Sequence, residues 1–101
     1  MSQRAFQLSH PAPETLAVSG ALTFATASEV LSAGRAELDR GGQVALDLAG
    51  VGQADSAGLA TVLALLAYAR GKGRSLSVVN TPAGLQALAR VSGVDSLLAL
   101  P

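Results

Sequence analysis

The feature of the sequence that most limits the possible fold is a helix-length segment, residues 57–69, with almost no polar side chains. Gly58 and Thr61 are its only residues that are not apolar. A helix that is apolar on every side must be covered over most of its surface, by its own domain or by a partner. Its longest uninterrupted apolar run, 62–69, is far shorter than the roughly 20 residues that cross a bilayer. The segment therefore predicts a packed helix in a globular domain.

The segments around this helix predict an α/β fold with a mixed, mostly parallel sheet. Apolar or alternating runs predict strands, and amphipathic runs between them predict helices. Helical crossovers join parallel strands, whereas the first two strands are close enough in sequence to be antiparallel. The element order is β-β-α-β-α-β-α in a single domain, 1–101, and a final strand at 97–100 is left open. The predicted strands are 5–9, 15–20, 44–48 and 76–80, and the predicted helices begin after Thr26, near Ser56 and at Pro82.

Composition excludes several classes of protein. Half of the residues are hydrophobic and 14% are charged, so an ordered core is expected. Seven basic residues balance seven acidic ones, and only three residues are aromatic. This balance argues against a nucleic-acid binder, which needs a basic face and stacking platforms. The chain has no cysteine, and its first residues lack the apolar core of a signal peptide. We expect a soluble, cytoplasmic protein without membrane insertion.

Two motifs resemble those of enzymes, and both are incomplete. Gly50 and Gly52 precede the helix as in a dinucleotide site, but Asp55 stands where the third glycine is needed. Residues 54–58 come within one residue of a nucleophile elbow around Ser56, yet the sole histidine, His10, lies upstream in a proline-flanked turn. With no cysteine and one histidine, the chain also lacks the usual ligands of a metal site. We therefore expect no catalytic activity, no cofactor and no metal.

The two ends of the apolar helix carry its polar residues. Asp55 or Ser56 can cap the N-terminus by accepting a bond from a free amide. Ser56 could also be a phosphorylation site, where added charge would oppose docking of an apolar partner. Arg70, Lys72 and Arg74 follow the C-terminus, where cations interact favourably with the helix dipole. We assign them no binding role, although they could touch an acidic partner.

Helical periodicity divides the apolar helix into two faces. At 100° per residue, one stripe is the predicted core face, and the opposite face is also apolar. Another element of the same domain could cover that second face. We favour an exposed docking face for a protein partner, because small residues allow close approach and tyrosine is a common interface anchor. The predicted core stripe is Leu59, Val62, Leu63 and Leu66, and the predicted docking face is Ala57, Thr61, Ala64, Leu65 and Tyr68.

The stretch "VALDLAGVGQADSAGLATVLALLAYARGKGRSLSVVNTPAGLQALARVSGVDSLL" resembles the STAS domain of bacterial anti-sigma factor antagonists and related regulators. The strand that ends in "LDL", the following "DSAGL", and "ALARVSGVDSLL" near the C-terminus carry the resemblance, which covers nearly the whole chain. "GALTFATASEV" also resembles the family's junction between a strand and its first helix. The resemblance implies a STAS-type α/β domain that binds another protein.

Two subfamilies compete. The Ala- and Leu-rich helix, the "AGLA" after Ser56 and the "RGKGRSL" turn resemble the small STAS subunit of the Mla phospholipid-transport ABC complex, which binds the ATPase subunit. This subfamily ranks first, and its partner would place the protein beside the inner membrane. In the runner-up, the anti-sigma factor antagonists, a partner kinase phosphorylates the serine that matches Ser56. Both imply partner binding by Asp55, Ser56, Ala57, Gly58, Thr61, Ala64, Leu65 and Tyr68.

Overall fold

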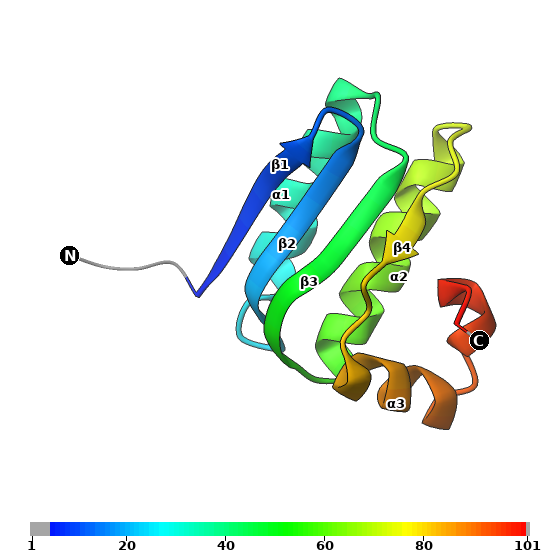
Figure 1. The fold of residues 1–101 in the computed structure, drawn as a ribbon. Coiled ribbons are helices and arrows are strands. Elements are labelled where there is room, and N and C mark those ends of the chain that lie inside the picture. Colours follow the sequence, from blue (N-terminus) through cyan, green and yellow to red (C-terminus); the bar gives the residue numbers. More distant parts are fainter. Residues whose placement is uncertain (1–4, 101) are drawn as a thin grey trace.

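The structure is a computed structural model that describes residues 5–100. It has one sheet of four strands in the order β1-β2-β3-β4, three α-helices and a short 3₁₀ helix (Figure 1). The elements follow the predicted order up to the third helix. Their bounds are β1 Phe6–Ala12, β2 Thr15–Leu22, α1 Ala27–Arg40, β3 Ala45–Ala54, α2 Ser56–Gly71, β4 Ser77–Val79, α3 Ala83–Val91 and η1 Asp95–Leu98.

The strand directions confirm the predicted mixed sheet. β1 pairs with β2 antiparallel, and β2 with β3 and β3 with β4 pair in parallel. Each parallel pair is joined by a helix, as crossover connections require. The β2–β3 register shifts twice, between Ala17 and Ser19 and between Gly20 and Ala21. Such irregularities bend a strand locally, and here they lie in the half of the sheet that leads to α2.

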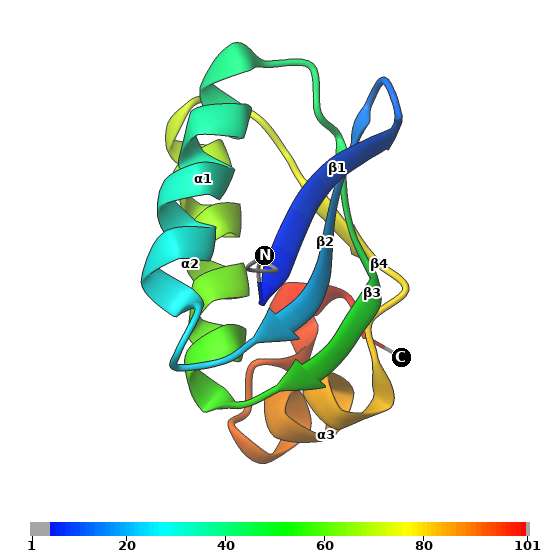
Figure 2. The same ribbon diagram turned by 90° about the vertical axis from the view of Figure 1, so that its left-hand side faces the viewer.

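Helices α1 and α2 lie side by side on the same face of the sheet (Figure 2). Leu16 and Val18 of β2 and Leu46 of β3 are fully buried beneath them. On the other face, Ser19 and Asp47 are partly exposed. The apolar 44–48 run predicted a strand covered on both faces, and this is wrong. Its large side chains pack against a single helical layer, while α3 packs near one end of the sheet (Figure 1).

Several predicted boundaries move. β1 continues through His10 and Pro11 to Ala12, because an edge strand tolerates a residue without an amide donor. β3 continues to Ala54, so Gly50 and Gly52 belong to a strand and not to a loop. The open possibility of a final strand at 97–100 is wrong, since residues Asp95–Leu98 form a 3₁₀ helix.

α1 begins after Thr26 as predicted, but Thr26 does not cap it through its side chain. The Thr26 hydroxyl donates instead to the carbonyl of Ala21, at 2.9 Å, and accepts from the amide of Thr23, at 3.0 Å. Thr26 is buried, so its hydroxyl is satisfied by the preceding turn and ties that turn to the end of β2.

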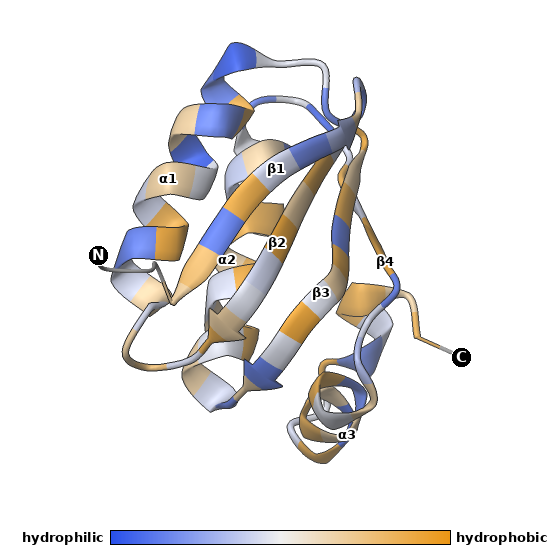
Figure 3. Ribbon diagram, turned by 60° about the vertical axis from the view of Figure 1, so that its left-hand side comes forward, coloured by the Kyte–Doolittle hydropathy of each residue, from blue (hydrophilic) through white to orange (hydrophobic). Residues whose placement is uncertain are grey.

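The two helices of this layer differ in polarity. α1 carries hydrophilic residues along its length, whereas α2 carries few (Figure 3). Despite this apolar composition, no helix among the described residues is long and apolar enough to span a membrane. The apolar residues of α2 are divided between those that pack within the domain and those that remain exposed on its surface.

Candidate functional site

The first turn of α2 lies in unusually close contact with the end of β2. A Cβ atom placed on Gly58 would lie only 1.8 Å from the carbonyl oxygen of Leu22. The amide of Asp55 donates to the same oxygen at 3.3 Å. Only glycine allows a helix to approach a neighbouring backbone this closely. This contact gives a structural reason for the glycine in the "DSAGL" motif and sets the position of the two polar residues before it.

Asp55 ties three segments together at this junction. One carboxylate oxygen accepts from the amide of Gly58 at 3.0 Å and caps α2. The other accepts from the amide of Phe24 at 3.0 Å, in the loop between β2 and α1. These hydrogen bonds to the charged form, the one from Phe24 foremost and that from Gly58 next, lower the pKa of the Asp55 carboxyl below its usual value. The predicted capping role of Asp55 is confirmed.

Ser56 begins α2 and is exposed. Because Asp55 provides the cap, the Ser56 hydroxyl is not needed for that purpose, and within residues 5–100 it makes no hydrogen bond. Its side chain stands beside the positive end of the helix dipole. The serine that the sequence singled out as a phosphoacceptor is thus accessible to a partner.

The buried stripe of α2 is rotated from the predicted one by about one residue position. Leu59 and Val62 are in the core as predicted, but Leu63 and Leu66 are only partly buried. A shift of one residue rotates a helix face by roughly 100°. The buried residues of α2 are Gly58, Leu59, Thr61, Val62, Leu65 and Ala69.

The prediction that Thr61 and Leu65 lie on an exposed docking face is therefore wrong. Thr61 is 5% exposed and Leu65 is 1% exposed. α1 lies against Leu65: a Cβ atom on Gly34 would lie 2.7 Å from the Cδ2 atom of Leu65, so glycine in α1 leaves room for this leucine. The Thr61 hydroxyl donates to the carbonyl of Ala57 at 2.9 Å and needs no outside partner. For Thr61 and Leu65, the alternative interpretation is correct: this part of the helix face is covered within the domain.

Tyr68 is also engaged within the domain. Its hydroxyl donates to Asp39 of α1 at 2.6 Å, and Lys72 forms an ion pair with the same carboxylate at 2.8 Å. The guanidinium of Arg35 lies 5.4 Å from the Tyr68 ring centre, within the range of a cation–π contact. The Lys72 ammonium, and then the Tyr68 hydroxyl, lower the pKa of Asp39. This surface cluster joins α1 to α2, so Tyr68 is not a free anchor for a partner.

The most exposed side of α2 forms a different stripe. Its members recur every three or four residues, as one helix face requires. Ala57 and Ala64, two residues of the predicted docking face, flank it and are partly buried. We call this set the α2 stripe: Ser56, Ala60, Leu63, Ala67 and Arg70, all exposed except the partly buried Leu63.

Phe24 extends this surface and was not predicted as a site residue. It is 73% exposed, and its amide is held by Asp55 next to the start of the α2 stripe. An available signal was a phenylalanine in a short polar loop, between a strand and a helix, in a chain with three aromatic residues. Large apolar side chains left this exposed next to other apolar residues are typical of interaction sites.

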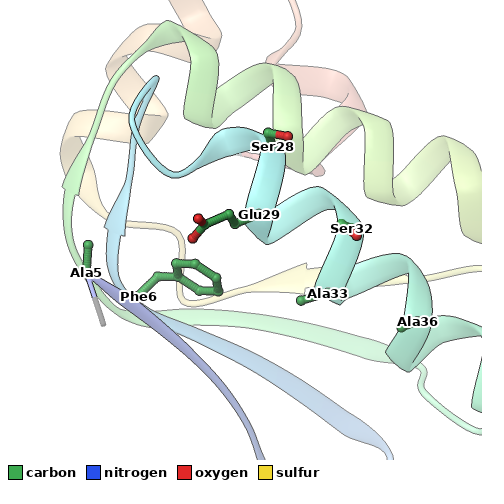
Figure 4. A pocket seen from close by; sticks show the side chains of 7 residues that line it. All are labelled: Ala5, Phe6, Ser28, Glu29, Ser32, Ala33 and Ala36. Atoms are coloured by element: carbon green, nitrogen blue, oxygen red, sulfur yellow. The ribbon is translucent and has the colours of Figure 1, made fainter. Parts of the chain in front are cut away.

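A hollow between β1 and α1 has a different character (Figure 4). Phe6 closes one side, and Glu29, Ser28 and Ser32 of α1 form the other (Figure 4). Among its lining residues, the Glu29 carboxylate is the one group that could act as a base beside these hydroxyls. Within the described residues, no group of three His, Cys, Asp or Glu side chains could hold a metal ion. The α2 stripe with Asp55 and Phe24 is therefore the better candidate site.

Comparison with solved structures supports a shared fold. The structure of the anti-sigma factor antagonist SpoIIAA in its unphosphorylated form matches with a TM-score of 0.70 and 18% sequence identity, covering 91% of this chain and 84% of the other. The phosphorylated form of SpoIIAA, a Bacillus cell fate determinant, matches with a TM-score of 0.66 and 18% identity, covering 91% and 86%. At this identity the likeness establishes the fold alone. A search of curated proteins found no significant match.

The family comparison covers almost all of the described chain. Residues 6–99 match the family described as "Mlab, STAS domain". The matched range begins in β1 and ends just after η1, so it includes the Asp55–Gly58 junction and the whole α2 stripe. The chain therefore belongs to the MlaB-type STAS domain family.

Proposed function

We propose that this protein is a non-catalytic binding subunit that docks on the ATPase of an Mla-type phospholipid ABC transporter. The observation that carries the proposal is a stripe of mostly small, exposed residues on α2, beside the exposed Phe24, in a chain that matches the MlaB-type family over residues 6–99. The docking surface consists of Phe24, the α2 stripe from Ser56 to Ala67, and the flanking Ala57 and Ala64. Asp55 and Gly58 position this surface without contacting the partner.

The shape of the surface suits a protein partner. Three of the stripe positions are alanine or serine, so a helix or loop of the partner can approach the α2 backbone closely. The larger apolar groups are Phe24, next to the start of the stripe, and the partly buried Leu63 within it. Interfaces of this kind gain most of their energy from a few buried large side chains, surrounded by contacts that exclude water. We expect Phe24 to be the main anchor.

The experiment compares two identical substitutions on different helices. Ala60→Glu places a charge in the α2 stripe, and Ala36→Glu places the same charge at an exposed position of α1. Both variants should keep the fold, because both alanines are exposed. Ala60→Glu should abolish co-purification with the cognate ATPase, since the carboxylate would be buried unpaired in the complex. Ala36→Glu should bind like the wild type.

Two results would overturn the proposal. One is failure of the wild-type chain to bind the cognate ATPase in calorimetry with both proteins purified. The other is equal binding by Ala60→Glu and Ala36→Glu. Circular dichroism of each variant, measured on the same samples, separates loss of binding from loss of fold.

A second candidate, an anti-sigma factor antagonist switched by phosphorylation of Ser56, is favoured by one observation. The Ser56 hydroxyl is exposed and makes no hydrogen bond among residues 5–100. A phosphate there would add about −1.5 to −2 charges beside Asp55 and an apolar surface, and would weaken docking. Mass spectrometry of the protein from its native cells tests this candidate. A phosphoserine whose level changes with stress would favour it over the transporter subunit.

A further inference from the structure

The C-terminal half of α2 borders a groove that extends beyond the proposed docking surface toward η1. Two adjoining hollows, of about 360 and 110 Å³, share Leu66, Arg70 and Leu97 among their lining residues. Leu63 and Ala67 of the α2 stripe line the smaller one, and Leu76 lines the larger one. The groove therefore runs between α2 and η1. Its smaller hollow is lined by apolar residues and Arg70, whereas the larger one is mostly polar. Leu97 is 55% exposed, so the apolar part of the groove is open to solvent.

The two arginines that line this groove differ in what they contact. Arg74 is committed to the domain: it donates to the side chain of Gln43 at 3.1 Å and to the carbonyl of Leu38 near the end of α1. Arg70 is exposed, and within residues 5–100 its side chain has no hydrogen bond or ion pair. The acidic residues Asp39 and Glu37 are paired with other cations. Among the described residues, Arg70 thus offers this groove an unpaired positive charge beside Leu66 and Leu97.

We propose that this groove binds an extended segment of the partner protein in which a large apolar residue is followed by a carboxylate. The apolar side chain lies on Leu66 and Leu97, and the carboxylate pairs with the Arg70 guanidinium, which suits carboxylates because it offers two parallel donors. The partner is a protein because the groove is continuous with the α2 stripe, which shares Leu63, Ala67 and Arg70 with it. The inference rests on the proposed function, and it adds the charge and shape of one partner segment.

The test uses two arginines in equivalent local positions. Arg70 lies in the last turn of α2 and Arg40 in the last turn of α1, so reversing either charge costs a similar interaction with a helix dipole. Arg40 also pairs with Glu37 at 3.9 Å, and circular dichroism of both variants checks that the loss of this exposed pair leaves the fold intact. Both changes alter the net charge by the same amount. Arg70→Glu should weaken binding of the full chain to the purified cognate ATPase by about tenfold and reduce the salt dependence of binding. Arg40→Glu should change affinity less than about threefold.

The outcomes separate this inference from the proposed function. If Ala60→Glu abolishes ATPase binding while Arg70→Glu and Arg40→Glu behave alike, the groove proposal is wrong and the docking surface stands. If the wild-type chain does not bind the ATPase, the groove is tested by nuclear magnetic resonance with a synthetic peptide in which one leucine precedes two glutamates.

The expected result is a saturable shift of the Leu97 and Gly73 amide signals that is lost in Arg70→Gln. A matched peptide with two lysines in place of the glutamates should give no shift. Equal responses to both peptides, or no response to either, overturn the groove proposal.

Discussion

Gly58 provides the most demanding test of the site, because its alanine variant adds a single methyl group where none fits. The new Cβ atom would lie 1.8 Å from the Leu22 carbonyl oxygen and 2.7 Å from the carbonyl carbon. Neighbouring atoms at such positions are essentially never closer than 3.0 Å, so α2 and β2 must separate by about 1 Å. Because the obstacle is backbone, no change of side-chain rotamer can relieve the clash.

The expected loss of stability follows from two opposing effects. Inserting a methyl group into a packed site costs about 1–3 kcal/mol, and a rigid obstacle favours the upper end. Replacing glycine by alanine inside a helix returns about 1 kcal/mol. We expect a net loss of about 2 kcal/mol in the free energy of unfolding, which lowers the melting temperature of a domain of this size by roughly 8–16 °C. The same movement pulls Asp55 away from Phe24 and should weaken partner binding.

Thermal unfolding followed by circular dichroism, with two other glycine variants, checks this reasoning. Gly84→Ala in α3 meets no atom within 4 Å and should raise the melting temperature. Gly34→Ala meets the Cδ2 atom of Leu65 at 2.7 Å, a flexible side-chain end, and should lie between the other two variants. A Gly58→Ala protein that melts as high as Gly84→Ala would refute the close-contact explanation of the motif.

Three further predictions follow from the same contacts. Leu65→Glu should unfold the domain, as measured by circular dichroism, because even the truncation Leu65→Ala would cost about 2–5 kcal/mol of folding free energy. A Leu65→Glu variant that keeps its fold would mean that α1 does not cover this residue. Because the pKa of Asp55 is lowered in the folded state, its ionised carboxylate stabilises the fold. This stabilisation is fully present above the usual pKa of 3.8 and is lost as the pH falls through the lower folded-state pKa. The difference in melting temperature between the wild type and Asp55→Asn should therefore become smaller in acid. A gap that stays constant as the solution is acidified from neutral pH to well below 3.8 would contradict this. Tyr68→Phe should raise the pKa of Asp39 in an NMR titration but leave it below 3.8, since Lys72 remains paired with that carboxylate.

Much of the fold was accessible from the sequence because it depends on local patterns. The order of strands and helices, the antiparallel first pair and the start of α1 follow from apolar periodicity and connection lengths. The cap by Asp55 was equally local, since the acceptor and the Gly58 amide are three residues apart. The "DSAGL" motif and its neighbours indicated the family for the same reason, because they form one continuous stretch of sequence.

What only the tertiary structure decided was the orientation of α2. Its segment is apolar all round, so periodicity alone distinguishes its faces poorly. The predicted core face was therefore rotated by about one residue position from the face that is buried. Which face of α2 is buried depends on α1, where Gly34 makes room for Leu65 and Asp39 accepts a hydrogen bond from Tyr68, 29 residues away. The exposure of Phe24 and of Arg70 likewise depends on which distant elements come near them. Contacts between segments far apart in the chain selected the free face of this helix, and no local pattern encodes them.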